Sequence, residues 1–114
     1  MRAVFLGRDL IIGSRIAEAA DRAGAELSRA GTPDELPAPA EVDLLLVDWG
    51  ERDADWGQRV AAWRDGAGER PVRIVVFGPH TDLEAHAAAR AAGIGPMLAR
   101  SKLVTSLSEL FAAR

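Results

Sequence analysis

Short runs of apolar residues alternate along the chain with longer segments in which apolar residues recur every three or four positions. The runs have the length of strands and are apolar at nearly every position, which is typical of strands buried on both faces of a parallel sheet. The amphipathic segments between them predict helices. Strands are expected at residues 3–6, 25–30, 42–48, 72–77 and 96–99.

The segments between the strands carry recognisable helix start and stop signals. Thr32 and Glu35 form a capping-box pattern, but Pro37 and Pro39 end that helix almost at once. A second capping box begins at Thr81 and opens another helix. Longer helices are expected at residues 10–23, 53–65, 81–92 and 101–113.

Strands and helices in this alternation predict an α/β fold with helices on both faces of a parallel sheet. Five such units in 114 residues have the size of a single flavodoxin-like (βα)5 domain spanning residues 1–114. The expected strand order is 2-1-3-4-5, and the second helix is expected to be short. In these folds the functional crevice lies outside the carboxyl ends of the strands. The residues expected there are Gly7, Arg8, Asp9, Asp48, Gly78 and Arg100.

Composition excludes several classes of protein. The net charge is −3, with Arg interspersed among Asp and Glu, whereas a nucleic-acid-binding domain usually carries a basic stripe. No apolar run approaches the roughly 20 residues of a membrane span. The chain has no cysteine and only two histidines, His80 and His86, which lack the spacing of metal ligands. We therefore expect a soluble cytoplasmic protein with no metal, cofactor, nucleic-acid or membrane partner.

Two stretches of the chain resemble the receiver domain of bacterial response regulators. "VDLLLVDWG", residues 42–50, is similar to that family's third strand, which ends in the phosphate-accepting Asp. "AAGIGPMLARSKLVTSLSEL" is similar to its last turn, strand and helix. The resemblance implies that Asp48 is the equivalent of the phosphoacceptor, and that the chain has the receiver fold and a role in signal transduction.

The other functional positions of the family differ in this chain. The acidic pair that holds Mg²⁺ after the first strand is replaced by Gly7 and Arg8, although loop plasticity could bring in Asp9. The family's Ser or Thr after the fourth strand is Gly78, and its Lys after the fifth strand aligns with Arg100. The switch aromatic of strand 5 aligns with Met97 and Lys102 follows shortly after.

These departures favour a degenerate receiver, or pseudo-receiver. Arg8, Asp48 and Arg100 are expected to form a fixed ion cluster that keeps Asp48 ionised and has no use for Mg²⁺. The resemblance then implies a non-catalytic signalling or scaffold module that acts by protein–protein contact, independent of phosphorylation. Two alternatives stay open: a single-domain response regulator phosphorylated on Asp48 with Asp9 as a metal ligand, and a small-ligand binder that uses the same crevice.

Several residues are candidates for partner contacts. Leu10 or Ile11 is expected at the rim of the crevice, because three bulky apolar residues cannot all face inward at the start of one helix. Trp56 and Trp63 are expected on the buried face of their helix, and Trp49 is expected to be partly exposed.

A homodimer is expected on the face built from the last two helices and the strand between them. In receivers this face often makes dimers, and an isologous dimer is the commonest homo-oligomer. The candidate contacts on it are Arg90, Met97 and Lys102.

Overall fold

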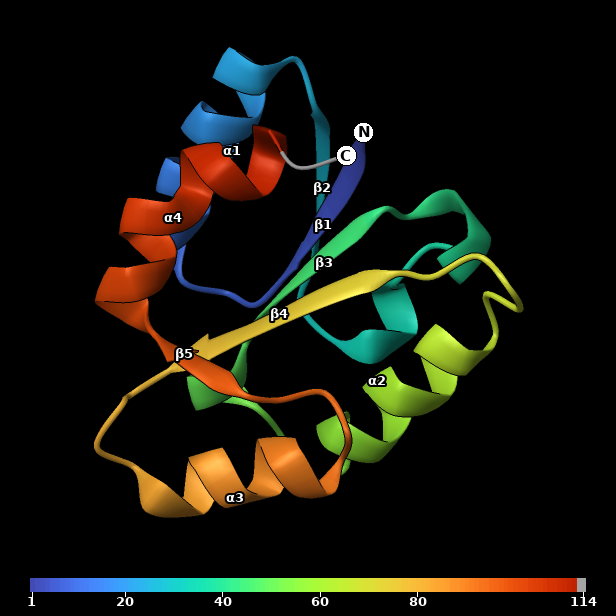
Figure 1. Cartoon of the computed structure of the whole chain (residues 1–114), viewed down its shortest axis with the longest axis vertical. Coiled ribbons are helices and arrows are strands. Elements are labelled where there is room, and N and C mark those ends of the chain that lie inside the picture. Colours follow the sequence, from blue (N-terminus) through green and yellow to red (C-terminus); the bar gives the residue numbers. More distant parts are fainter. Residues whose placement is uncertain (113–114) are drawn as a thin grey trace.

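The computed structural model describes residues 1–112 and contains one five-stranded parallel sheet, visible edge to edge in Figure 1. The strand order is β2-β1-β3-β4-β5, which confirms the prediction. The strands are β1 (Arg2–Leu6), β2 (Glu26–Ala30), β3 (Leu44–Asp48), β4 (Arg73–Gly78) and β5 (Met97–Ala99). Their bounds lie within a few residues of the apolar runs, because those runs are the parts of the chain that fill the centre of the molecule.

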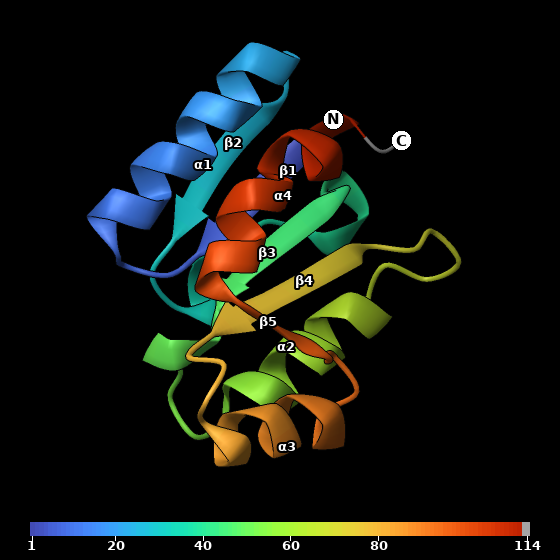
Figure 2. The same cartoon turned by 60° about the vertical axis from the view of Figure 1, so that its left-hand side comes forward.

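Four α-helices cover the two faces of the sheet (Figures 1 and 2). The first and last lie side by side on one face, and the other two cover the opposite face (Figure 2). The helices are α1 (Leu10–Ala23), α2 (Trp56–Asp65), α3 (Leu83–Ala91) and α4 (Arg100–Ala112). None of the helices in residues 1–112 combines the length and the apolar character that crossing a membrane requires.

The core has two halves, one on each side of the sheet. Along β3, Leu44 and Leu46 pack with the residues of α1 and α4, whereas Leu45 and Val47 pack with those of α2 and α3. Successive side chains of a strand point to opposite faces, so a strand buried on both sides must be apolar at every position. This explains why the run before Asp48 shows no alternation.

The second predicted helix differs from expectation. In place of a short α-helix the chain forms two 3-10 turns, η1 (Pro33–Glu35) and η2 (Pro39–Glu41). The capping box of Thr32 and Glu35 is present, but the prolines that follow cannot supply the amide hydrogens that an α-helix needs. The indole N–H of Trp63 donates to the carbonyl of Pro37 at 2.8 Å and fixes this segment against α2.

Two other helix starts were placed too early by the sequence patterns. The helix expected from residue 53 begins at Trp56, and the cap of α3 is Asp82 rather than Thr81, because the Asp82 carboxylate accepts the N–H of Ala85. The last helix ends at Ala112, and the predicted extension to Ala113 lies outside the described residues.

Replacing Gly57 by Ala should destabilise the fold, although alanine is the better helix former. A Cβ at position 57 would lie 2.8 Å from the Ala92 Cβ and 3.2 Å from Cη2 of Trp49, so α2 and α3 would have to separate. We expect a loss of about 1 kcal/mol in the free energy of unfolding, measured by urea denaturation. Gln58→Ala, at the exposed neighbouring position, is the control and should be neutral. A more stable Gly57→Ala variant would contradict this close approach.

Candidate functional site

The crevice at the carboxyl ends of the strands is centred on Asp48, the last residue of β3. This side chain is fully buried, and it is the only buried charged residue in residues 1–112. Gly7 follows β1 beside it, where an added Cβ would lie 2.8 Å from the Asp48 Cβ and 2.8 Å from the Phe5 ring. The loop after β1 can therefore pass this closely over Asp48 only because residue 7 has no side chain.

Arg100 is the basic residue that reaches Asp48. It begins α4, and its Nη2 lies 3.3 Å from Oδ1 of Asp48. Gly50 leaves room for this guanidinium, because a Cβ at position 50 would come within 2.9 Å of Nη2. Oδ2 of Asp48 has no hydrogen-bond partner among the described residues, and the same is true of Nε of Arg100.

Burial raises the pKa of Asp48 above its ordinary value of 3.8. Arg100 opposes this effect, while the nearby carboxylates of Glu51 and Asp9 add to it. The predicted effect, in which flanking guanidinium groups lower the pKa of Asp48, is therefore outweighed by burial. One partly exposed guanidinium does not replace the hydration that the buried carboxylate loses.

Arg8 does not join the ion cluster that was predicted for it. Its side chain is exposed and lies beside Gly31, where an added Cβ would be 3.7 Å from Nε of Arg8. Only its backbone points toward the crevice, where its N–H donates to Oε2 of Glu51 at 3.0 Å. The cluster of Arg8, Asp48 and Arg100 is thus reduced to a single pair, because the backbone at position 8 directs the side chain out of the crevice.

Three carboxylates form a cluster where the ion cluster of Arg8, Asp48 and Arg100 was predicted. Asp9, Asp48 and Glu51 each contribute an oxygen that lies within 4.8 Å of the others. Asp9 is the N-cap of α1, and its Oδ1 accepts the N–H groups of Ile11 and Ile12 at 2.9 and 3.1 Å. Sequence reasoning overlooked Glu51, although its position three residues after Asp48 was a signal, since a single 3-10 turn brings such residues together.

This donor set fits a hard divalent cation such as Mg²⁺. Carboxylate oxygens are the ligands such ions prefer. One oxygen of the cluster, Oδ2 of Asp48, is buried without a hydrogen-bond partner. Asp9, Asp48 and Glu51 are the residues that would hold the ion, and it would neutralise their crowded negative charge. The expectation of a metal-free crevice stays a prediction.

The phosphate-binding hydroxyl of receivers has no counterpart at Gly78, and the structure leaves no space for one. A Cβ there would lie 2.9 Å from Sδ of Met97 and 3.3 Å from the backbone nitrogen of Gly50. Met97 is itself buried, so the prediction that it contacts a partner is wrong. The sulfur of Met97, on β5, packs against Gly78 of β4.

Trp49 is buried, which corrects the prediction of partial exposure. It opens the 3-10 turn η3 (Trp49–Glu51), and its indole N–H donates to the Ala85 carbonyl at 2.9 Å. The Arg52 guanidinium covers the ring at 4.9 Å from its centroid. The chain therefore turns inward directly after Asp48, and the indole joins this loop to α3. Trp56 is buried and Trp63 is half-buried, as predicted.

Exposed apolar residues gather at the rim of the crevice. Leu10 and Ile11, in the first turn of α1, are 74% and 75% exposed, which confirms that this stretch cannot be buried as a whole. Leu83, in the first turn of α3, is also exposed. Since α1 and α3 begin after β1 and β4, these side chains lie at the same edge of the sheet as Asp48.

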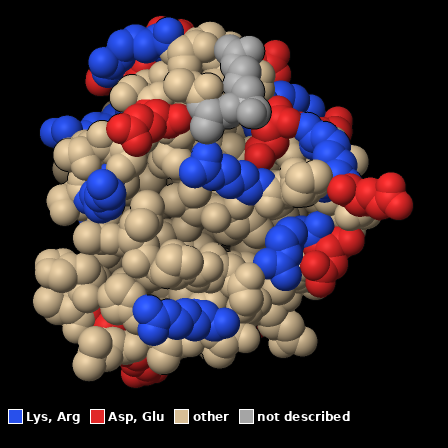
Figure 3. Space-filling model, in the orientation of Figure 1, with Lys and Arg blue, Asp and Glu red and all other residues tan. Residues whose placement is uncertain are grey.

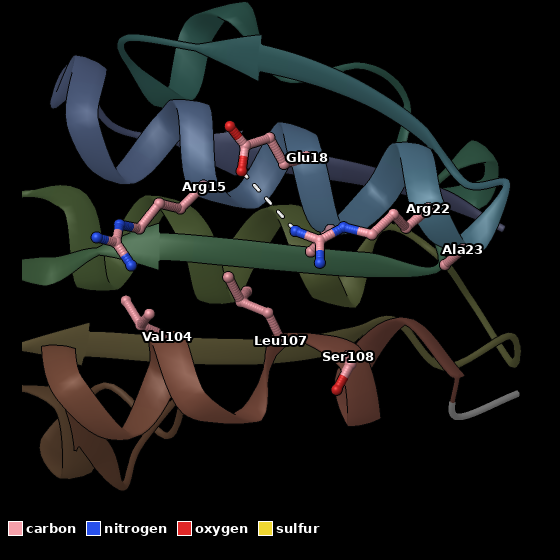
Figure 4. Close-up of a pocket in the computed structure, with 8 residues that line it drawn as sticks. Arg15, Glu18, Arg22, Ala23, Val104, Leu107 and Ser108 are labelled. Carbon is pink, nitrogen blue, oxygen red and sulfur yellow. Dashed lines mark ion pairs between the residues drawn. The ribbon is translucent and has the colours of Figure 1, made fainter.

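The larger grooves in the described part of the chain lie between pairs of helices. One, of 430 Å³, runs between α1 and α4, where Arg15, the Glu18–Arg22 ion pair and Leu107 line it (Figure 4). A shallower groove between α2 and α3 is lined mainly by alanines. Neither is lined by Leu10 or Ile11, so neither supports the small-ligand alternative, which needed a pocket at the crevice.

No family model and no curated protein matches the chain, but solved structures do. A response regulator protein from Burkholderia multivorans has a TM-score of 0.72 and 22% identity over 97% of this chain and 91% of its own. An atypical orphan response regulator, described as having a phosphorylation-independent regulatory mechanism, has a TM-score of 0.70 and 14% identity over 100% and 98%.

The beryllofluoride-activated NtrC4 receiver domain dimer has a TM-score of 0.63 and 14% identity over 96% of this chain and 98% of its own. Together these structures establish that the chain has the receiver fold of response regulators. The predicted resemblance is confirmed at the level of fold.

The raised pKa of Asp48 predicts how the Asp48→Asn variant responds to pH. A carboxyl whose pKa is higher in the folded state opposes folding once the pH exceeds its unfolded value of 3.8. The free energy of unfolding of Asp48→Asn, relative to the natural chain, should therefore increase as the pH rises from about 3.5 to 7. Urea denaturation at a series of pH values measures this difference.

Asp43→Asn is the matched control, because the pKa of Asp43 is lowered, mainly by the hydrogen bond from the Arg2 backbone N–H. Its carboxylate stabilises the fold above the unfolded pKa, so this variant should lose stability relative to the natural chain as the pH rises. The same sign of change in both variants would show that Arg100, and not burial, decides the protonation of Asp48.

Proposed function

We propose that this chain is a non-catalytic, receiver-like signalling module that acts by protein–protein contact without being phosphorylated. The observation that carries the proposal is the complete burial of Asp48, whose Oδ1 is held by Arg100. A phosphodonor has to reach a carboxylate oxygen in line with its leaving group. A carboxylate with no exposed surface does not offer such an approach.

The surroundings of Asp48 support the same conclusion. Gly78 supplies no hydroxyl for phosphoryl oxygens, and Met97 and Gly50 fill the space that a side chain there would need. The orphan regulator of the same fold is described as working without phosphorylation, which is a precedent within this architecture. The exposed Leu10 and Ile11 at the crevice rim supply an apolar surface on which a protein partner could dock.

A second candidate function is that of a phosphorylated single-domain response regulator. The cluster of Asp9, Asp48 and Glu51 favours it, because phosphoryl transfer to a carboxylate needs a divalent cation to neutralise the crowded anions. The two candidates differ in one chemical event, the formation of a phosphoryl-aspartate at position 48.

Incubation with acetyl phosphate and Mg²⁺, followed by intact-protein mass spectrometry, should give no adduct at Asp48, because its oxygens are covered. Asp48→Asn is the control for adducts at other residues. A phosphoryl adduct on the natural chain that is absent from Asp48→Asn would reject the proposed function and establish the second candidate.

A separate proposal concerns self-association through the surface over α3 and β5. Charged side chains are sparse over these elements in the lower part of Figure 3, whereas both signs are interspersed elsewhere on this face. Arg90 on α3 and Lys102 on α4 are exposed at this surface, while Met97 lies beneath it. We propose that two copies meet here in an isologous dimer, and the dimeric NtrC4 receiver shows that this fold can dimerise.

Lys102→Glu should weaken this dimer about tenfold, because it reverses a charge at the edge of the contact. Sedimentation velocity over a range of concentrations measures the change. Arg29→Glu makes the same reversal on β2, the strand at the opposite edge of the sheet from β5, and should leave the dimer intact. A chain that stays monomeric at all concentrations, or an equal effect of both variants, would refute this interface.

A further inference from the structure

The carboxylate cluster of the crevice is built differently from the metal site that the receiver resemblance implies. That site takes two neighbouring acidic residues after the first strand, and this chain has Gly7 and Arg8 at those two positions. We propose that Asp9, Asp48 and Glu51 bind a hard divalent cation, and that Glu51 supplies from the loop after β3 a carboxylate that Gly7 and Arg8 do not provide.

The first support is the state of Asp48. It is fully buried, and its Oδ2 accepts no hydrogen bond within residues 1–112, while Arg100 contacts Oδ1 only. A buried acceptor without a partner is costly, and a charged one more so. Two further carboxylates within 4.8 Å increase that cost. A divalent cation is the ligand that would relieve both the unmet acceptor and the repulsion among the three groups.

The second support is that each of the other carboxylates keeps one oxygen free. The hydrogen bonds of Asp9 within the described residues use Oδ1, in capping α1. Those of Glu51 use Oε2, which accepts the N–H of Arg8. Asp9 Oδ2, Asp48 Oδ2 and Glu51 Oε1 are therefore left for a ligand. Three carboxylate oxygens with both flanking side chains already oriented are a suitable donor set for Mg²⁺, Mn²⁺ or Ca²⁺.

The local backbone explains how Glu51 reaches the cluster. In a 3-10 turn, residues three apart lie on the same side, so η3 returns Glu51 to the side of Asp48. Trp49 anchors this turn through its hydrogen bond to Ala85, and the N–H of Arg8 draws the Glu51 carboxylate toward β1. The backbone N–H of Arg8 thus orients the Glu51 carboxylate, although the side chain of Arg8 itself is exposed.

This inference does not rest on the proposed function. A cation could bind at this cluster and change the conformation of the rim that carries Leu10 and Ile11 without any phosphoryl transfer. The mass-spectrometric experiment above tests phosphorylation separately. Cation binding without an adduct would define a phosphorylation-independent module that responds to divalent ions.

Paramagnetic Mn²⁺ titrated into the ¹⁵N-labelled full chain tests the proposal. Broadening of amide resonances should begin at Asp9, Gly50 and Glu51, and diamagnetic Mg²⁺ should compete with it. Glu51→Gln should weaken Mn²⁺ affinity at least about tenfold, as expected when one of three charged ligands is lost. Asp53→Asn is the matched control, because it removes an exposed carboxylate two residues further along and should have no such effect.

The conservative variant Glu51→Asp separates a ligand from a merely structural residue. It keeps a carboxylate at position 51 and should retain more Mn²⁺ affinity than Glu51→Gln. Urea denaturation of each variant checks that the fold is retained. The proposal is overturned if no site-specific broadening occurs up to about 10 mM Mn²⁺. It is equally overturned if Glu51→Gln binds as tightly as Asp53→Asn.

Discussion

The carboxylate of Asp48 lies at the end of the central strand, where it is fully buried. A charged group in that position requires compensation from the protein around it. One guanidinium, that of Arg100, reaches one of its oxygens, and the other oxygen has no partner among the described residues. The buried negative charge of Asp48 is therefore only partly neutralised by the protein, and this determines which ligands the crevice can bind.

The tight packing around Asp48 depends on small residues at three strand ends. Gly7 allows the loop after β1 to pass over the carboxylate, Gly50 admits the Arg100 guanidinium, and Gly78 accommodates the sulfur of Met97. The same glycines leave no side-chain oxygen near Asp48 from β1 or β4. This close packing around Asp48 is one of the observations behind our proposal that the chain acts without being phosphorylated.

Those loops lead to surfaces that a partner could meet. Trp49, next to Asp48, is hydrogen-bonded to the first turns of α3, and Asp9 caps α1, whose exposed Leu10 and Ile11 follow directly. A change at the carboxylate cluster would therefore act on the starts of two helices on opposite faces of the sheet. The crevice is thus connected to its apolar rim by residues adjacent in the chain and by the hydrogen bonds of Trp49 and Asp9.

The sequence by itself determined the strand order, the approximate positions of the five strands and four α-helices in residues 1–112, and the place of Asp48 at the carboxyl ends of the strands. These features depend on local patterns: continuous apolar runs, helical periodicity and capping residues act within a few positions. The tertiary structure alone decided that Arg8 turns outward, that Trp49 is buried and that Glu51 joins Asp9 and Asp48. Such outcomes depend on the direction in which each side chain leaves its loop and on contacts between residues far apart in the chain, which no local pattern encodes.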